Sequence, residues 1–501
     1  MPPSTSVHDI KTLIASFHPL LVMETPEEER LHEILDTAAA ELRMTLFEWS
    51  ITRGLQRKGA PGLIPGKITG GNSPLGVLKH IETLSVEGIY LLQDFDRYLE
   101  DPAVARKLRE VAQHFMRTRS ALVLSGRSVP MPEDLQHLAV YCELALPADE
   151  ELRSVFDTLV ASLRSSHRIR IELDPVEEEQ FLQALRGLTL NEARQTIAHA
   201  AVTDGKLSVS DIHHVQDRKA QLLRDGGLLE YFPAADNPFR LAGFTRLKEW
   251  LARARLGFSA EARELNLTPP KGILLVGVQG CGKSLSAKVI AREWQLPLLK
   301  LDAGSLYDKY IGESEKNLRK ATAQAEAMAP CVLWIDEIEK GFATSGSGGE
   351  GDGGVGRRIF GTFISWLQEK RADVFVVATA NDLTSLPPEL LRKGRFDEIF
   401  FVDLPAAEER ENIFRIHLEL RKQDPASFDL AALVAASEGF SGAEIEQAVI
   451  AGLYRALHRK QALCTELVLQ EIRETVPLSI SRREDVEHLR ALARERFVPV
   501  V

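Results

Sequence analysis

The residues best suited to chemistry lie in one short glycine-rich segment, which reads Gly277-Val-Gln-Gly280-Cys281-Gly282-Lys283-Ser284. It follows the apolar run from Gly272 to Val276, and a helix is expected to start near Lys283. Glycines let the backbone fold closely around an anion, and the free N–H groups at a helix start attract negative charge. The spacing predicts a phosphate-binding loop in which Lys283 reaches the β- and γ-phosphates and Ser284 ligates Mg²⁺. Cys281 is expected to be a passive filler.

A pair of carboxylates follows a second strand signal. The run from Cys331 to Ile335 is apolar, and Asp336 and Glu337 come directly after it. Ligands bind at the carboxyl ends of strands in doubly wound sheets, and strand alternation sends adjacent side chains in different directions. We therefore expect Asp336 to hold Mg²⁺ and Glu337 to orient and deprotonate an attacking water. The alternative, that both carboxylates only cap the next helix, is weak beside an intact phosphate-binding loop.

Two more polar features follow along the chain. A third apolar run, from Val374 to Ala380, ends at Asn381, whose amide suits a hydrogen bond to a γ-phosphate or to the attacking water. Further on, Arg392 and Arg395 stand on either side of a glycine, shortly before the apolar run from Ile399 to Val402. Taken alone, Asn381 is a turn residue and the two arginines are solvated surface residues.

Together, these motifs occur in the order found in the AAA family of ATPases, which the chain resembles from about residue 241 to residue 457. The resemblance implies an α/β fold, a P-loop AAA+ parallel sheet with a C-terminal helical lid, and hydrolysis of ATP to ADP and phosphate with Mg²⁺. It also implies that Arg392 and Arg395 are arginine fingers that enter the nucleotide site of a neighbouring subunit. The expected assembly is a homo-oligomeric ring, with six subunits as the family number.

The family pattern also implies contacts around the base and ribose. Gly243, Gly442 and Ala443 are expected beside adenine, and His417 near the adenosine. Together with the loop, the expected nucleotide contacts are Gly243, Gly277, Gln279, Gly280, Cys281, Gly282, Lys283, Ser284, Leu285, His417, Gly442 and Ala443.

Two loops resemble the pore loops of protein-translocating rings. In the segment from Tyr310 to Glu315, Tyr310 takes the aromatic gripping position, although without the resemblance an aromatic residue is more often core material. The glycine-rich segment from Thr344 to Gly356 falls where the second pore loop lies. Arg357 and Arg358 follow it and are expected at the channel, at the subunit boundary or on a solvated helix start.

Length and composition set the broad class. The chain has 501 residues, of which 44% are hydrophobic and 27% charged, so several globular domains are expected. The net charge of −11 counts against nucleic acid as the main partner. No apolar run approaches membrane-spanning length, so we expect a cytoplasmic protein without a membrane partner. Neither a disulfide framework nor a zinc site is indicated, because no CxxC pair links Cys142, Cys281, Cys331 and Cys464.

The first half of the chain repeats the second in a damaged form. The segment from Leu146 to Phe156 matches that from Leu404 to Phe414 without a gap, with six of eleven positions identical. Where a phosphate-binding loop is expected, the chain reads Glu24-Thr-Pro-Glu-Glu-Glu29, without glycine or lysine. There Thr25 is expected to cap the following helix. We interpret this half as a degenerate AAA-like α/β module that binds no ATP in the usual manner.

The expected domains are the degenerate module at 1–225, a linker at 226–240, the AAA large subdomain at 241–404, the helical lid at 405–475 and a tail at 476–501. This combination resembles the hypothetical chloroplast reading frame 46 family of plastids and bacteria. That resemblance implies a regulatory role linked to photosynthesis or carbon uptake. The leading hypothesis is a ring that remodels or threads a protein client of unknown identity. The alternatives are a nucleic-acid-stimulated ATPase and a nucleotide-controlled scaffold.

Overall fold

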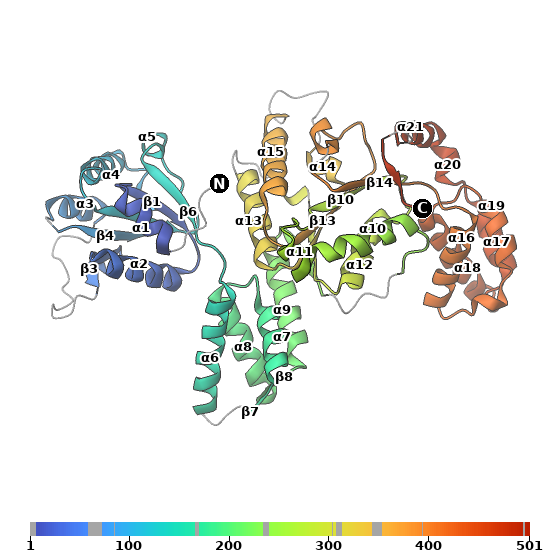
Figure 1. Ribbon diagram of the computed structural model, residues 1–501, viewed down its shortest axis with the longest axis horizontal. Helices are drawn as coiled ribbons and strands as arrows, with labels where there is room; N and C mark the ends of the chain where they lie inside the picture. Colours follow the sequence, from blue (N-terminus) through green and yellow to red (C-terminus); the bar gives the residue numbers. More distant parts are fainter. Residues whose placement is uncertain are drawn as a thin grey trace. The chain divides into compact units, whose positions relative to one another are not determined.

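The computed structural model describes residues 7–58, 73–84, 86–165, 170–233, 240–302, 304–306, 313–342, 353–392, 394–493 and 496–501. The chain divides into two compact units, of which unit 1 comprises Met1–Ile171 and Leu188–Lys206 and unit 2 comprises Glu172–Gly187 and Leu207–Val501. Each unit contains one large β-sheet (Figure 1).

Unit 1 is built on a six-stranded sheet in the order β3-β2-β4-β5-β1-β6. Only the β2–β3 pair is antiparallel. The apolar runs of the first half form these strands, which are β1 (Leu20–Glu24), β2 (Thr45–Ser50), β3 (Gly54–Lys58), β4 (Gly88–Gln93), β5 (Ala121–Gly126) and β6 (Ala139–Glu143).

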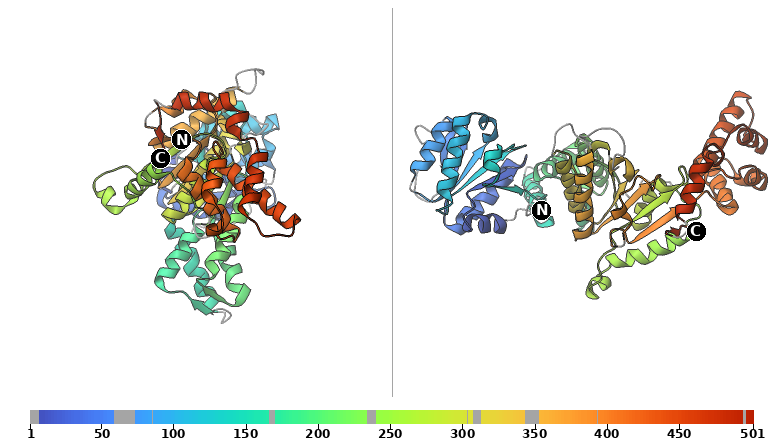
Figure 2. Two further views of the ribbon diagram at one scale, coloured as in Figure 1. Left: turned by 90° about the vertical axis from the view of Figure 1, so that its right-hand side faces the viewer. Right: turned by 90° about the horizontal axis from the view of Figure 1, so that it is seen from above.

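Side-chain alternation along these strands feeds a core on each face of the sheet. Tyr90 packs with residues of α3 (Pro74–Thr83) and α4 (Pro102–Phe115), whereas its neighbour Ile89 packs with α1 (Val7–Ala15) and α2 (Glu28–Leu42). The sheet of unit 1 is visible between these helices in Figure 2. The short elements η1 (Phe95–Tyr98) and α5 (Glu133–Gln136) lie in the connections.

Helices follow the six-stranded sheet in sequence. α6 (Asp149–Ser165) and α8 (Leu190–Asp204) pack against each other in unit 1. α7 (Pro175–Leu185) and α9 (Asp211–Asp225) pack against each other and fall in unit 2. The short strands here are β7 (Arg170–Glu172) and β8 (Lys206–Ser208).

Unit 2 contains a seven-stranded sheet in the order β15-β14-β10-β13-β12-β11-β9. Only β9 is antiparallel to its neighbour. The strands are β9 (Leu229–Phe232), β10 (Gly272–Gly277), β11 (Leu298–Leu301), β12 (Cys331–Ile335), β13 (Val374–Ala380), β14 (Glu398–Val402) and β15 (Val498–Pro499). The strands predicted around the P-loop and the acidic pair are therefore confirmed, and the parallel α/β fold with them.

Helices cover both faces of this sheet. α13 (Glu313–Ala327) and α15 (Gly353–Glu369) pack on one face, while α10 (Thr245–Arg255) and α12 (Lys283–Trp294) pack on the other. The short elements are η3 (Leu256–Phe258), α11 (Ala260–Glu264), η4 (Gly304–Leu306), α14 (Ile338–Phe342) and η5 (Pro388–Leu391).

The expected helical lid follows β14 and has its own core, which includes Phe414, Leu433 and Val449. It contains α16 (Ala407–Leu420), η6 (Pro425–Ser427), α17 (Leu430–Ala436), α18 (Gly442–His458) and α19 (Thr465–Glu474). Two further helices, α20 (Leu478–Ser481) and α21 (Arg483–Ala493), lead to β15.

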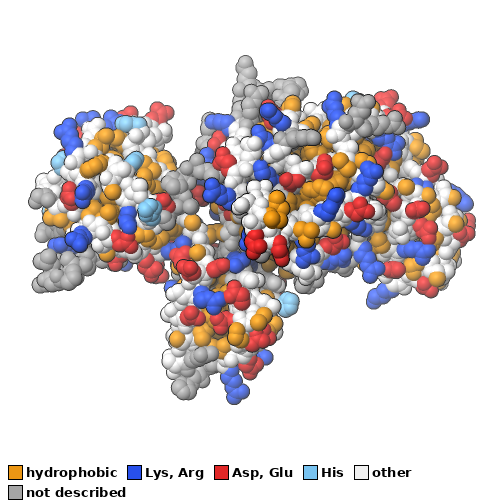
Figure 3. Space-filling model, in the orientation of Figure 1, with side chains coloured by type: hydrophobic (Ala, Val, Ile, Leu, Met, Phe, Trp, Pro, Cys, Tyr) orange, Lys and Arg blue, Asp and Glu red, His pale blue; other side chains and the backbone are white. Residues whose placement is uncertain are grey.

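On the face shown in Figure 3, acidic, basic and hydrophobic side chains are interspersed over both units. None of the helices in the described ranges combines the length and apolarity needed to cross a membrane.

Candidate nucleotide site

The glycine-rich loop connects β10 to α12 with the backbone geometry of a phosphate cradle. Gly282 is the N-cap of α12 with φ 94°, and Gly280 has φ 77°. A Cβ on Gly282 would lie 3.3 Å from Leu241 Cδ1, and one on Gly280 would lie 3.0 Å from Ser441 Oγ. Side chains are therefore disfavoured here by both backbone and space, which leaves the amide groups of the loop available to an anion.

The P-loop lysine is buried at the base of the loop. Lys283 is 5% exposed, and its Nζ donates 2.8 Å hydrogen bonds to the carbonyl oxygens of Gly277 and Val278. Burial lowers the pKa of Lys283 from 10.5 to about 8. Phosphate oxygens are stronger acceptors for an ammonium group than these carbonyls, so the loop suits a polyphosphate.

The proposed metal ligands meet across the sheet. Ser284 Oγ donates a 2.7 Å hydrogen bond to Asp336 Oδ1, and Thr379 Oγ1 donates one of 2.6 Å to the same oxygen. A hydroxyl and a carboxylate in contact form the oxygen donor set that Mg²⁺ prefers, with phosphate oxygens and water completing its shell. These residues fit the metal that the loop implies.

The second carboxylate points to a different set of partners. Glu337 adopts a left-handed backbone conformation with φ 49°, and its N–H donates to Thr379 Oγ1 at 3.0 Å. Asn381 Nδ2 donates a 3.0 Å hydrogen bond to Glu337 Oε1, and Lys340 forms an ion pair with Glu337. The structure thus brings the expected base and the expected sensor amide together.

Glu339 contacts the backbone of Asn381, the second member of this pair. It is 8% exposed, its Oε1 accepts a 2.9 Å hydrogen bond from the Asn381 N–H, and burial raises its pKa. Its other oxygen, Oε2, is buried and makes no hydrogen bond within the described residues. Glu339 therefore fixes the backbone that carries the Asn381 amide.

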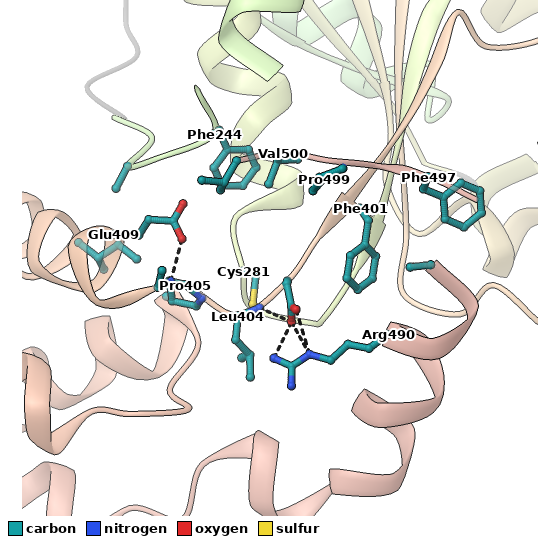
Figure 4. A pocket seen from close by; sticks show the side chains of 17 residues that line it. Phe244, Cys281, Phe401, Leu404, Pro405, Glu409, Arg490, Phe497, Pro499 and Val500 are labelled. Atoms are coloured by element: carbon teal, nitrogen blue, oxygen red, sulfur yellow. Dashed lines mark hydrogen bonds and ion pairs between the residues drawn. The ribbon is translucent and has the colours of Figure 1, made fainter. Parts of the chain in front are cut away.

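A cavity of about 500 Å³ opens beside the loop. Cys281 and Phe244 line it together with Ile413 and Gly442 of the lid (Figure 4). The same Phe244 ring lies 3.6 Å from the position of a Cβ on Gly282, so the cavity lies next to the glycine-rich loop. Its size falls in the range of small-molecule sites and suits a nucleoside.

The remaining expected contacts lie at different distances from this cavity. Ala443 N donates a 3.0 Å hydrogen bond to the Gly280 carbonyl, which joins the lid to the loop. Gly243 has φ 67°, and a Cβ there would lie 1.9 Å from Glu409 Oε1. Gln279 is exposed at the loop tip, and Leu285 is half-buried in the first turn of α12.

His417 is engaged with its own neighbours. Its Nδ1 lies 3.6 Å from Glu446 Oε1 and 3.2 Å from Arg421 Nη1, and burial lowers its pKa. It is absent from the described residues that line the cavity. The structure therefore does not bring His417 to the cavity wall with Gly442.

The arginines lie at the surface of unit 2. Arg392 is exposed, and Arg395 is half-buried with an Nε that makes no hydrogen bond within the described residues. Arg358 Nε lies 3.7 Å from Glu315 Oε1. Tyr310, most of the 344–356 segment and the side chain of Arg357 lie outside the described part of the chain.

Sequence reasoning missed several residues of the site. Thr379 and Glu339 position residues that are predicted to be catalytic, yet in sequence Thr379 resembles any strand residue and Glu339 any exposed helical glutamate. Phe244, Asp403 and Arg490 line the cavity from three separate segments. A polar residue within the otherwise apolar run of β13 was the one local signal for Thr379.

The matching region of unit 1 is built without a phosphate cradle. Glu27 is 5% exposed and accepts hydrogen bonds from Arg30 Nη1 at 3.2 Å and from the Leu190 N–H at 2.8 Å. The cap prediction was wrong in detail, because α2 begins at Glu28 with Glu27 as N-cap. Thr25 Oγ1 instead accepts from the Glu27 N–H at 3.0 Å.

Two signatures of the internal repeat are nevertheless present. Asp94 follows β4 with φ 49°, the value that Glu337 has after β12. The helices α8 and α18 both start with a complete capping box, Thr189 with Glu192 and Ser441 with Glu444. Both units therefore share local backbone features at equivalent places.

Comparison with known families agrees with this geometry. Residues 273–404 match the ATPase family associated with various cellular activities (AAA). Residues 6–144 match the N-terminal domain of SpoVK-like AAA ATPases, and residues 150–226 match their second domain.

Several curated proteins are similar over most of the chain. An uncharacterized AAA domain-containing protein ycf46 from Trieres chinensis is 37% identical over 472 residues, covering 93% of this chain and 92% of its own. The ycf46 protein of Guillardia theta is 37% identical over 487 residues, covering 96% and 94%. A proteasome-activating nucleotidase from Aeropyrum pernix is 35% identical over 227 residues, covering 44% of this chain and 54% of its own. The chain therefore belongs to the AAA family of ATPases, among the ycf46 AAA domain-containing proteins.

Proposed function

We propose that unit 2 hydrolyses ATP with Mg²⁺ and that identical subunits form a ring that remodels or threads a protein client. The observation that supports the ATPase proposal is that the hydroxyls of Ser284 and Thr379 both donate hydrogen bonds to Asp336, next to the glycine-rich loop. Bound Mg²⁺ would neutralise charge on the phosphate oxygens. Lys283 and the loop amides would hold the same phosphates in place.

Within this proposal Glu337 takes the proton of the attacking water. The Asn381 amide and the Lys340 ammonium both contact the Glu337 carboxylate and so define its orientation. Glu339 holds Asn381 through the backbone. A base oriented by fixed neighbours gains from positioning as well as from proton transfer.

The ring is proposed because the side chain of Arg395 has a nitrogen atom without a hydrogen-bond partner among the described residues of its own subunit. The Nε of Arg395 is buried without a hydrogen bond, and Arg392 is exposed. An arginine supplied by a neighbouring subunit contributes about three to five orders of magnitude to phosphoryl transfer. Hydrolysis then depends on assembly, with six subunits as the proposed number.

A subunit-mixing experiment tests the ring and the ATPase together. Arg395→Ala removes the finger but keeps its own site, whereas Glu337→Gln loses the base but keeps the finger. An equal mixture should hydrolyse ATP faster than the sum of the two variants measured alone. A mixture of Lys283→Ala with Glu337→Gln is the matched control, because it contains no intact site. Simple additivity in the first mixture contradicts fingers that act between subunits.

The protein client is supported by similarity to a protein that is named a proteasome-activating nucleotidase. Tyr310 is the proposed gripping residue, and a reducing cytoplasm or plastid stroma is the proposed location. Proteins that the Glu337→Gln variant retains from cell extract are candidate clients. Tyr310→Ala should keep ATP hydrolysis but no longer remodel or thread these clients. Unimpaired work would contradict threading, and stimulation of ATP turnover by RNA or DNA at low salt would favour the nucleic-acid alternative.

A further inference from the structure

One wall of the cavity beside the P-loop comes from the far end of the sequence. The cavity is lined there by Arg490 and Ala493 of α21, by Phe497, and by Pro499 and Val500 at the β15 segment. In Figure 4 the labelled members of this set, Arg490, Phe497, Pro499 and Val500, lie along the cavity together with Phe244 and Phe401. Neither the phosphate loop nor the acidic strand end supplies this wall.

The backbone of this wall is fixed on both sides. β15 pairs in parallel with β14 through Phe400 with Val498 and Phe401 with Pro499. Val500 N donates a 3.2 Å hydrogen bond to the Phe401 carbonyl, and the Val500 carbonyl accepts from Arg246 N at 3.0 Å. Since Arg246 lies in the first turn of α10, the segment joins the sheet edge to the helix start that Phe244 caps.

A charged contact anchors the helix before this strand. Arg490 Nε lies 2.9 Å from both oxygens of Asp403, and its Nη2 lies 2.8 Å from Oδ1. Asp403 directly follows β14 and also accepts a 2.7 Å hydrogen bond from the Leu404 N–H. The pair therefore ties α21 to the connection between the sheet and the lid, as the dashed lines in Figure 4 show.

The wall has the chemistry of a base-binding surface. Val500 is 4% exposed and belongs to the same apolar core as Phe244 and Cys281. Flat apolar surfaces bind a purine ring through exclusion of water, whereas the triphosphate is held by the loop amides. The two ends of one nucleotide thus contact different parts of the chain.

We propose that Arg490, Pro499 and Val500 form one wall of the base pocket, and that this wall and a bound nucleotide stabilise each other. This inference rests on the proposed ATP site and adds a second, sequence-distant determinant of its affinity. By linkage, bound nucleotide must stabilise the docked position of residues 498–501 by the same factor by which these residues raise nucleotide affinity.

Binding of two probes tests the wall directly. MgADP has a base, whereas magnesium tripolyphosphate occupies only the phosphate cradle. In a variant that lacks residues 498–501, calorimetry should show about tenfold weaker MgADP binding, equivalent to about 1.4 kcal/mol, with tripolyphosphate binding unchanged. Equal losses for both probes, or none for MgADP, would overturn the proposal. If the wild-type chain binds neither probe, the ATP site itself is wrong.

Arg490→Ala should also weaken MgADP binding. Arg483→Ala is its matched control. Both arginines lie on α21, and Arg483 pairs only at the surface with Glu487 at 2.9 Å among the described residues. The control should bind like the wild type, and a loss equal to that of Arg490→Ala would count against the wall.

Hydrogen exchange on the unaltered chain covers the case in which the shortened variant does not fold. The amides of Val500 and Arg246 should exchange about tenfold more slowly with saturating MgADP than without it, and no more slowly with tripolyphosphate. Protection by both probes, or by neither, would contradict a wall that senses the base.

Discussion

Ser284 and Asp336 are 52 residues apart in sequence, yet the serine hydroxyl donates a 2.7 Å hydrogen bond to the aspartate. A divalent cation placed between them would exchange this bond for two metal–oxygen contacts. The P-loop and the acidic strand end are thus positioned for one metal, and this relationship supports the predictions that follow.

Removing the hydroxyl should weaken the metal site specifically. We expect Ser284→Ala to lower Mg²⁺ affinity and ATP hydrolysis about 10–100-fold, because one oxygen donor is lost. Hydrolysis measured against Mg²⁺ concentration should recover in part at high Mg²⁺. Ser427→Ala, at an exposed position of the lid, is the control. An unchanged Mg²⁺ dependence would remove Ser284 from the site.

Neutralising the base should separate binding from hydrolysis. Glu337→Gln keeps an acceptor for the Asn381 amide but loses the basic carboxylate, so hydrolysis should fall about 10²–10⁴-fold while ATP stays bound. Single-turnover hydrolysis and a binding assay measure the two effects. Glu408→Gln, on the exposed side of α16, should leave both unchanged. Hydrolysis retained in Glu337→Gln would show that another group is the base.

Thr379 offers a test of a residue that the motif pattern did not indicate. Thr379→Val preserves shape but removes the donor to Asp336 and the acceptor for the Glu337 N–H. Hydrogen bonds to charged groups contribute about 1.5–3 kcal/mol, so activity should fall about 10–100-fold with nucleotide affinity nearly unchanged. Thr384→Val in the following turn is a comparison of the same chemistry. Equal activity in the two variants would assign Thr379 no role.

The buried P-loop lysine makes nucleotide affinity sensitive to alkaline pH. Because its pKa is lowered to about 8, Lys283 loses its charge as pH rises through 8, and MgADP affinity should fall by up to tenfold per pH unit above that value. Cys281 stays a thiol in this window, since burial raises its pKa to about 12. Calorimetry from pH 7 to 10 measures the slope, which should vanish in Lys283→Arg.

The same lysine affects stability with the opposite sign. Between about pH 8 and its ordinary pKa of 10.5, Lys283 is charged in the unfolded chain and neutral in the folded one. The unfolded state then binds more protons, so the contribution of Lys283 to the free energy of unfolding rises with pH through this window. Denaturation of the wild type compared with Lys283→Met should show that rise. A difference that stays constant with pH would place the folded pKa at its ordinary value.

Local motifs explain which parts were predictable from the sequence. Gly282, Lys283 and Ser284 lie at one junction between a strand and a helix, and the apolar runs predict the central strands. These features depend on short-range geometry, so a single sequence contains them. The internal repeat then extended the predicted fold to the first half of the chain.

Contacts between distant segments were not predictable where no motif links the two residues. Thr379 reaches Asp336 from a neighbouring strand, and Arg490 reaches Asp403 across 87 residues. No spacing rule connects such pairs, because the fold alone sets their distance. Thr25 was misplaced as a cap since the helix starts two residues later than its turn residues indicate. A two-residue strand such as β15 carries no periodic signal at all.

The carboxylate of Glu27 has a consequence for how each subunit works. It bonds the start of α8 to the start of α2 through atoms that belong to the chain itself. Both partners of this bond belong to unit 1, whereas under the proposed function the corresponding place in unit 2 would gain and lose a phosphate in every cycle. Unit 1 should therefore keep one internal arrangement throughout, as a constant platform, and internal rearrangement during turnover should concentrate in unit 2.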